Sequence, residues 1–239
     1  KAEQELKIYN EELKNKNKEL EQFAYIASHD LQEPLKTVSS LVDLLSDQHE
    51  NKLDDEARHF LGFIKSATLR MTNLINGLLE YSRIGANKTL GSVDCVKMIH
   101  NILADFSSII KQSDAEFEIL ELPVIMGYET ELRQLFQNLI HNAIKFRKTN
   151  RRPKISLSSQ YKFDHWEFCV KDNGIGIESK HQSKIFMIYQ RLHSRNEYEG
   201  TGIGLSHCQK IVEMHKGKIW VESVPNEGSA FYFTISNYL

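Results

Sequence analysis

The chain has 239 residues and a hydrophobic fraction of 41%, which is typical of a soluble protein with one large domain or two modest ones. Its formal net charge of −2 gives no sign of a nucleic-acid partner or of an anionic membrane surface. No apolar run approaches the about 20 residues that span a bilayer, and no signal peptide is recognisable. The three cysteines form no CxxC pair, which favours reduced thiols in a cytoplasmic protein.

Residues 1 to 48 contain no glycine and one proline, Pro34, which predicts a long helix bent near that residue. Apolar and asparagine residues recur at heptad spacing along two neighbouring seams: Leu6, Leu13, Leu20 and Ala27, and Asn10, Asn17, Ala24 and Leu31. This pattern favours a parallel coiled-coil dimer, and a single amphipathic helix on a monomer is the alternative. In either heptad register His29 lies outside the seam and faces outward.

Polar residues 46 to 54 predict a turn, after which Asp54 or Asp55 caps a second helix that runs to about Ser82. Its apolar residues follow helical spacing: Phe60, Phe63, Ile64, Ala67, Met71, Leu74, Ile75 and Leu78. Two such helices in each chain of a dimer form a four-helix bundle. Residues 83 to 92 have two glycines and no periodic pattern, and they predict a linker.

From Val93 onward the pattern predicts intermixed helices and strands. We expect helices at 95–112, 128–147 and 202–215, and strands at 117–120, 123–126, 154–161, 166–170, 218–223 and 230–235. Because strict βαβ alternation is missing, the prediction is an α+β domain, a mixed sheet with helices on one face. Trp166 and Trp220 are expected to anchor the core, and Cys169 to lie within it.

Two glycine-rich motifs lie at the ends of predicted elements, one after a strand and one at the start of a helix. In DNGIGI, Asp172 ends a strand and Gly174 and Gly176 follow it. A carboxylate there can accept a hydrogen bond from an exocyclic amine, and glycines let the backbone approach a flat ring, although the same residues also form ordinary turns. In GTGIGL, residues 200–205, the glycines open a helix whose free amides attract phosphate oxygens.

The helix containing QNLIHNAIKF, residues 137–146, carries a third group of polar residues. Asn138, Asn142 and Lys145 are three or four residues apart and share one face. An amide oxygen is a hard ligand suited to magnesium, and a lysine can neutralise a phosphate. A solvated polar helix face is the alternative interpretation.

Together with SHDLQEPL, residues 28–35, these motifs resemble the boxes of the histidine kinase family. SHDLQEPL resembles the phosphoacceptor box, QNLIHNAIKF the asparagine box, and DNGIGI and GTGIGL the two glycine boxes. KIFMIYQRLH, residues 184–193, resembles the phenylalanine box with the start of the nucleotide lid. The resemblance covers residues 20–236. The residues HDLQEPL are similar to the phosphoacceptor box of the subgroup found in phytochrome-like and PAS-linked kinases.

The resemblance implies the chemistry of each box. His29 would attack the γ-phosphorus of ATP, and Asp30 would hold the other ring nitrogen and stabilise the developing positive charge. Asn142 would bind Mg²⁺, with Asn138 as a second contact, and Lys145 would meet phosphate.

For the nucleotide base, the resemblance implies that Asp172 reads the adenine amine while Gly174 and Gly176 shape that wall. Gly202 and Gly204 would hinge the lid and contact phosphates. The lid itself would span residues 187–199, in which Arg191, His193 and Arg195 either touch phosphates or form a solvated charge cluster.

The implied architecture is a coiled-coil signalling helix (1–22), a dimerisation and histidine phosphotransfer domain (23–84), a linker (85–92) and an α/β-sandwich ATP-binding catalytic domain (93–239). The partners would be a second copy, the receiver domain of a response regulator, and an upstream sensor, since a chain that begins at Lys1 rather than Met suggests a longer protein. Glu33 stands four residues after His29, where many family members carry threonine or asparagine, which puts phosphatase activity in doubt.

Two other functions use the same residues. One is simple ATP hydrolysis, as in the related chaperone and topoisomerase ATPases, and the exposed His-Asp pair argues against it. The other is a dimerisation and scaffold module that binds nucleotide without turnover. The presence of Asp172, Asn142 and both glycine boxes argues against that reading.

Overall fold

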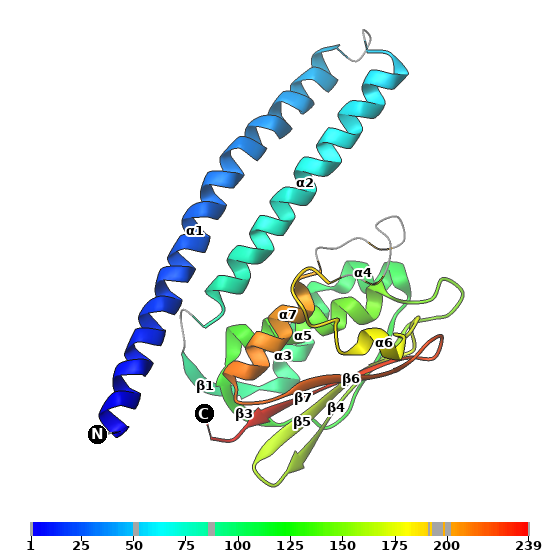
Figure 1. The fold of residues 1–239 in the computed structure, drawn as a ribbon. Helices are drawn as coiled ribbons and strands as arrows, with labels where there is room; N and C mark the ends of the chain where they lie inside the picture. The colour runs from blue at the N-terminus through cyan, green and yellow to red at the C-terminus, as the bar shows by residue number, and fades with distance from the viewer. Residues whose placement is uncertain are drawn as a thin grey trace. The chain divides into compact units, whose positions relative to one another are not determined.

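The computed structural model describes residues 2–49, 53–85, 89–190, 192, 198 and 202–238. The chain divides into two compact units, Lys1–Arg83 and Ile84–Leu239 (Figure 1). The side chains of the heptad positions Leu6, Asn10, Leu13, Asn17, Leu20 and Ala24 lie outside the described part. The coiled-coil interpretation therefore stays a prediction.

The first unit is a helical hairpin of α1 (Ala2–His49) and α2 (Asp55–Arg83). Helix α1 continues through Pro34, which has no N–H to donate to the carbonyl of Asp30 one turn earlier. It also extends to His49, beyond the start of the predicted turn. Asp54 caps α2 as predicted, because its Oδ1 accepts a hydrogen bond of 2.7 Å from the amide of Ala57.

The hairpin buries only a narrow seam between its two helices. Val42 and Thr68 are buried there, and the Nζ of Lys65 donates to Asp43 Oδ1 at 2.7 Å across the helices. Large apolar side chains remain exposed on both helices: Ile26, Leu31, Val38, Leu41, Leu44, Leu45, Phe60, Phe63, Ile64, Leu69 and Met71. A surface this apolar is typical of an interaction face.

The second unit is an α/β domain. Its elements in chain order are β1 (Leu90–Asp94), α3 (Cys95–Asp105), α4 (Ser107–Ser113), β2 (Glu116–Ile119), β3 (Val124–Tyr128), α5 (Glu129–Lys145), β4 (Lys154–Lys162), β5 (His165–Asp172), α6 (Ser179–Gln182), α7 (Gly204–Met214), β6 (Ile219–Val224) and β7 (Gly228–Ser236).

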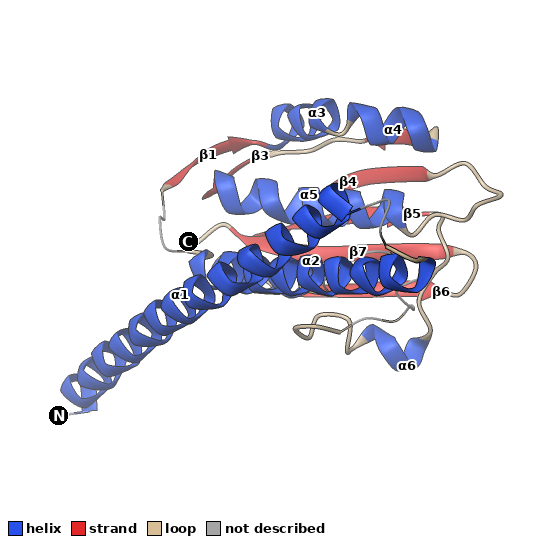
Figure 2. Ribbon diagram, turned by 90° about the horizontal axis from the view of Figure 1, so that it is seen from above, coloured by secondary structure: helices blue, strands red, loops and turns tan. Residues whose placement is uncertain are grey.

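Five strands form a sheet in the order β2-β4-β5-β7-β6, in which the β2–β4 pair is parallel and the other pairs are antiparallel. Strands β1 and β3 pair separately, and Figure 2 shows this pair set apart from the larger sheet. Helices α5 and α7 pack on one face of the sheet, and α3 packs beside α5 (Figures 1 and 2). The predicted mixed sheet with helices on one face is confirmed.

Three local predictions differ from the structure. The helix expected at 95–112 breaks at Phe106, which ends α3 and precedes α4. Residues 90–92 of the predicted linker belong to β1, where they pair with residues 126–128 of β3. Helix α6 was not expected, because four residues are too few to show a periodic pattern.

Phenylalanines rather than tryptophans anchor the core. Phe136 of α5 packs edge-on against Phe168 of β5 and Phe233 of β7, and the latter two stack with centroids 5.0 Å apart. Burying each such side chain contributes about 1.5–3 kcal/mol. The expectation for the tryptophans is wrong, because Trp166 and Trp220 are only half-buried.

Cys169 is also half-buried rather than part of the core. Successive side chains of a strand point to opposite faces of the sheet, and the neighbouring Phe168 and Val170 are buried on the helix-covered face. Cys169 therefore lies on the other face, opposite Tyr232 in the register, and Tyr232 stacks on Trp220 there.

Candidate functional site

The His-Asp pair lies on the exposed side of α1. The side chains of His29 and Asp30 are 58% and 72% exposed, whereas the preceding Ser28 is buried. His29 Nδ1 lies 3.5 Å from Asp30 Oδ1. The predicted outward orientation of His29 is confirmed within the described hairpin, and its Nδ1 is the ring nitrogen beside the carboxylate.

Helix α5 carries the three polar residues of the asparagine box. Its apolar side is fully buried against the sheet, while Asn138, Asn142 and Lys145 are half-buried. The Nζ of Lys145 lies 4.6 Å from the centroid of the Phe146 ring. A Cβ added to Gly204 would lie 3.1 Å from Asn138 Oδ1, so that the asparagine box and the start of α7 are in contact.

Asp172 ends β5 and is held by two backbone amides. Its Oδ1 accepts hydrogen bonds from Gly174 N at 2.8 Å and from Ser229 N at 3.3 Å. Both bonds use Oδ1, which leaves Oδ2 to accept from a further donor. Burial raises the pKa of this carboxyl to about 6, and the two amide bonds oppose that shift.

The loop after Asp172 requires its two glycines. A Cβ on Gly174 would lie 2.5 Å from the carbonyl oxygen of Phe146. Gly176 has φ +72°, and a Cβ there would lie less than 3 Å from the backbone of Val224. Each contact is closer than real Cβ atoms allow, so only glycine fits without a shift of the chain.

Backbone hydrogen bonds fix this loop between α5 and the β6–β7 turn. Ile175 N donates to Phe146 O at 3.0 Å, and Asn226 N donates to Ile175 O at 2.7 Å. The end of the asparagine box and the DNGIGI loop are thereby brought together. Asn226 itself has φ +67°, a conformation that asparagine tolerates better than most residues.

The second glycine box leads into α7. Gly202 has φ +76°, and α7 begins at Gly204 without a side-chain hydrogen bond from its N-cap, Ile203. The first backbone amides of α7 therefore have no side-chain cap from Ile203, and their N–H groups point out of the N-terminal end of the helix, where they can bind phosphate oxygens. The predicted lid residues Arg191, His193 and Arg195 lie outside the described residues.

Sequence reasoning missed several residues around this site. The Tyr198 ring packs on Phe146 with centroids 5.0 Å apart, and its hydroxyl donates to Arg147 O at 3.4 Å. Ser229 supplies the second amide to Asp172. The sequence offers one signal for each residue, which is its place in a motif: Tyr198 stands just before GTGIGL, and Ser229 lies in PNEGSAF.

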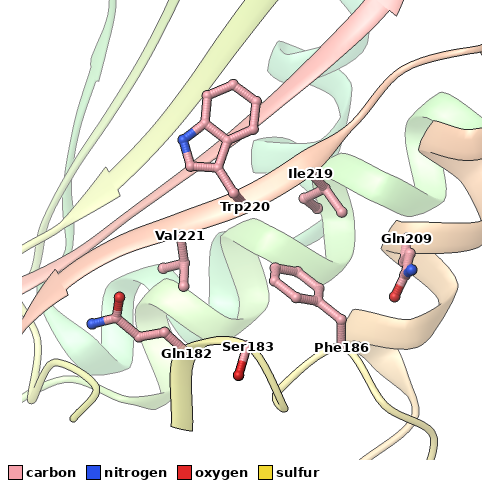
Figure 3. A pocket seen from close by; sticks show the side chains of 7 residues that line it. All are labelled: Gln182, Ser183, Phe186, Gln209, Ile219, Trp220 and Val221. Atoms are coloured by element: carbon pink, nitrogen blue, oxygen red, sulfur yellow. The ribbon is translucent and has the colours of Figure 1, made fainter. Parts of the chain in front are cut away.

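A cavity of about 400 Å³ lies beside the site, between α6, α7 and β6. Figure 3 shows Gln182 on one wall with Val221 above it and Gln209 on the opposite side, while the Trp220 indole points away from the others. None of the predicted nucleotide-binding residues lines this cavity.

In the described part of the chain no helix is long and apolar enough to cross a membrane.

Two family models match the chain. Residues 19–87 match the His Kinase A (phospho-acceptor) domain. Residues 127–238 match the histidine kinase-, DNA gyrase B-, and HSP90-like ATPase family. The two matches contain the His-Asp pair and all the predicted nucleotide residues, respectively.

Among curated relatives, the phytochrome-like protein Cph1 of Synechocystis sp. is 44% identical over 224 residues, which cover 93% of this chain and 30% of that protein. Cyanobacterial phytochrome A of Nostoc sp. is 44% identical over 225 residues, with 94% and 29% covered. The chain thus spans about 30% of the length of these relatives.

Among solved structures, full-length ShkA in complex with AMPPNP has a TM-score of 0.66 and 23% identity, with 90% of this chain and 45% of that chain covered. Histidine kinase ThkA in complex with the response regulator TrrA has a TM-score of 0.63 and 22% identity, with 96% and 66% covered. At these identities the two structures show a shared fold. With both family models in the expected order, the chain belongs to the histidine kinase family, as a transmitter region in which a phospho-acceptor domain precedes an ATPase domain.

Proposed function

We propose that this chain is the transmitter of a dimeric, ATP-dependent protein-histidine kinase. It transfers the γ-phosphoryl group of ATP to His29 and then to an aspartate on the receiver domain of a response regulator. The observation that carries this proposal is the combination, in one chain, of an exposed His29–Asp30 pair with a half-buried Asp172 that two backbone amides hold beside the asparagine box. The ThkA–TrrA complex supports the regulator as partner by analogy.

The position of Asp30 suggests how the imidazole reacts. A carboxylate beside Nδ1 favours the tautomer with the proton on Nδ1, which leaves the lone pair of Nε2 free for attack. The bond from Nε2 to the γ-phosphorus forms as the bond to the β,γ-bridging oxygen breaks, and ADP leaves. The ring gains positive charge, which Asp30 stabilises until the Nδ1 proton passes to solvent.

The C-terminal unit binds and orients ATP. Asp172 accepts a hydrogen bond from the adenine amine at Oδ2, Gly174 and Gly176 form the wall beside the ring, and Lys145 neutralises phosphate. Gly202 and Gly204 allow the segment before α7 to approach the phosphates.

Asn142 is the proposed ligand of Mg²⁺, with Asn138 as a second contact. A half-buried amide oxygen fits this ion, which usually takes one or two protein oxygens together with substrate phosphates. When bound, Mg²⁺ neutralises charge on the phosphate oxygens during transfer.

The hairpin supports a homodimer, because its exposed apolar side chains need a partner surface. We assign residues 1–22 to a signalling helix, 23–84 to dimerisation and phosphotransfer, 85–92 to a linker that ends inside β1, and 93–239 to catalysis. An upstream sensor, which the longer phytochrome relatives support by analogy, and a cytoplasmic location complete the proposal.

Incubation with ATP labelled in the γ-phosphate tests the proposal. We expect label on the protein that is lost in acid and kept in base, as phosphohistidine requires. His29→Gln should abolish it, and His49→Gln, at the exposed end of the same helix, should leave it unchanged. Steady release of phosphate without labelled protein would instead identify a simple ATPase.

A further inference from the structure

Behind Asp172, polar side chains connect the DNGIGI loop to α6 and to the β6–β7 hairpin. We propose that Gln182 and Ser223, here called the Gln182–Ser223 clamp, are positioning residues that determine how selectively this site takes adenine nucleotides. The inference rests on the proposed role of Asp172 as the reader of the adenine amine. It adds two residues that touch neither the base nor the phosphates.

The Ser223 hydroxyl uses all of its hydrogen-bonding capacity inside the protein. Its Oγ accepts from Ile177 N at 2.8 Å and donates to Gly228 O at 2.8 Å. Since its single proton is then committed, the contact of 2.9 Å with Ser229 Oγ is a bond that Ser229 donates. One hydroxyl therefore joins the end of the DNGIGI loop to both sides of the β6–β7 turn.

The Gln182 amide makes the second connection. Its Nε2 donates to Ile177 O at 3.0 Å and to Ser223 O at 2.8 Å, which uses both amide protons. In Figure 3 its side chain runs from the α6 segment alongside Val221 of β6. Ile177 is thus held at its N–H by Ser223 and at its C=O by Gln182.

The clamp reaches Asp172 through Ser229 and Gly228. Ser229 is buried, bonds Ser223 through its hydroxyl, and donates its backbone N–H to Asp172 Oδ1 at 3.3 Å. Gly228 lies so close to the carbonyl of Asp172 that a Cβ would not fit. A shift of the turn therefore moves the carboxylate that meets the base.

A displacement of Asp172 should affect the binding of some nucleotide bases more than others. Asp172 recognises an exocyclic amine, so its placement affects ATP more than ITP, which carries an oxygen at that position. Removal of either clamp side chain leaves polar backbone groups without partners and lets the loop relax. We expect a weaker affinity for ATP, a smaller preference for ATP over ITP, and little change in the rate once the nucleotide is bound.

Calorimetric titration of the whole chain with ATP and with ITP measures this effect, together with KM and kcat of autophosphorylation. Ser223→Ala and Gln182→Ala should each raise the Kd for ATP roughly three- to tenfold, the effect of one or two hydrogen bonds. The preference over ITP should fall by a similar factor, with kcat changed less than about twofold.

Two variants serve as controls. Ser223→Thr keeps the hydroxyl on a strand residue and should restore the wild-type preference. Gln209→Ala, on the opposite wall of the same cavity, removes only an exposed hydrogen bond to Glu213 and should change neither affinity.

The outcomes separate this inference from the proposed function. If the wild type does not prefer ATP to ITP, or if Asp172→Asn keeps that preference, the assigned role of Asp172 fails. If both hold but the clamp variants bind ATP and ITP like the wild type, or lose affinity for both equally, the clamp inference is overturned. Should Ser223→Ala not fold, Gln182→Ala and Ser223→Thr decide the question.

Discussion

The hairpin exposes phenylalanine side chains of α2, whereas the C-terminal unit buries phenylalanines between α5 and its sheet. In the hairpin, Phe60 and Phe63 are 54% and 59% exposed, while in the C-terminal unit Phe136 and Phe168 are each 1% exposed. The C-terminal unit thus has a core of its own, and the hairpin must cover its apolar faces by association. Stability is thus local in the C-terminal unit, and in the proposed dimer it would be shared between chains in the hairpin.

The same contrast applies to the reactive groups. His29 lies on an exposed helix surface, where a large partner can reach it, and its Nδ1 lies 3.5 Å from Asp30 Oδ1. Asp172 is half-buried and bonded by two backbone amides, which suits recognition of a small rigid base. A relay residue requires access, and a specificity residue requires a fixed position.

The largest effect expected comes from removing a core phenylalanine. Phe233→Ala should destabilise the C-terminal unit by about 3–5 kcal/mol, because Phe233 is fully buried between two other rings. Phe63→Ala should instead weaken the proposed dimer and lower only the hairpin transition, which depends on protein concentration because it is coupled to dissociation. Scanning calorimetry at several concentrations checks both variants. A hairpin transition of Phe63→Ala that does not depend on protein concentration would show that the hairpin is stable without a partner chain.

Glycine substitutions give the next largest contrast. Gly176→Ala should cost about 2–4 kcal/mol and abolish ATP binding, since it combines φ +72° with a clash against Val224. Gly62→Ala in the interior of α2 has nothing within 4 Å and should stabilise the hairpin by about 0.5–1 kcal/mol. Thermal melts measure both changes, and equal effects of the two would contradict the account.

The pH dependence of Asp172 gives a smaller effect. Burial raises the pKa of its carboxyl from 3.8 to about 6, so between these values the folded protein binds more protons than the unfolded chain. The stability associated with this group is therefore full below about pH 4 and is lost as the pH rises through 6.

Asp172→Asn should remove that dependence. Compared with the wild type, the variant should be equally stable near pH 4 and roughly 2–3 kcal/mol more stable above pH 6. The difference between the two proteins isolates Asp172 from His215, whose pKa is lowered by burial and which has the opposite pH dependence. A difference that stays constant from pH 4 to 7 would show that Asp172 does not titrate in this way.

Long periodic elements and the motifs at their ends could be predicted from the sequence. Helix α5 and strand β5 were expected close to their observed bounds, and the hydrogen bond from Ile175 N to Phe146 O joins the motifs at their ends. These elements carry strong local patterns, and the two glycines after Asp172 signal close backbone approach.

Features that depend on distant contacts could not be predicted. Ser223 and Gln182 look like ordinary polar residues until folding places Ile177 between them. Trp220 seemed a core residue by its type, but the strand alternation places it beside Tyr232. The break at Phe106 interrupts a pattern that reads as one continuous helix.

The central claim is that His29 receives the phosphoryl group of ATP. Mass spectrometric mapping of the autophosphorylated chain at neutral to basic pH, with fragmentation across residues 26–36, tests it most directly. We expect one phosphoryl group on His29, with none on the neighbouring Ser28, which is buried in the hairpin. Phosphate found on Ser28 or on any histidine other than His29 would show that His29 is not the acceptor proposed here.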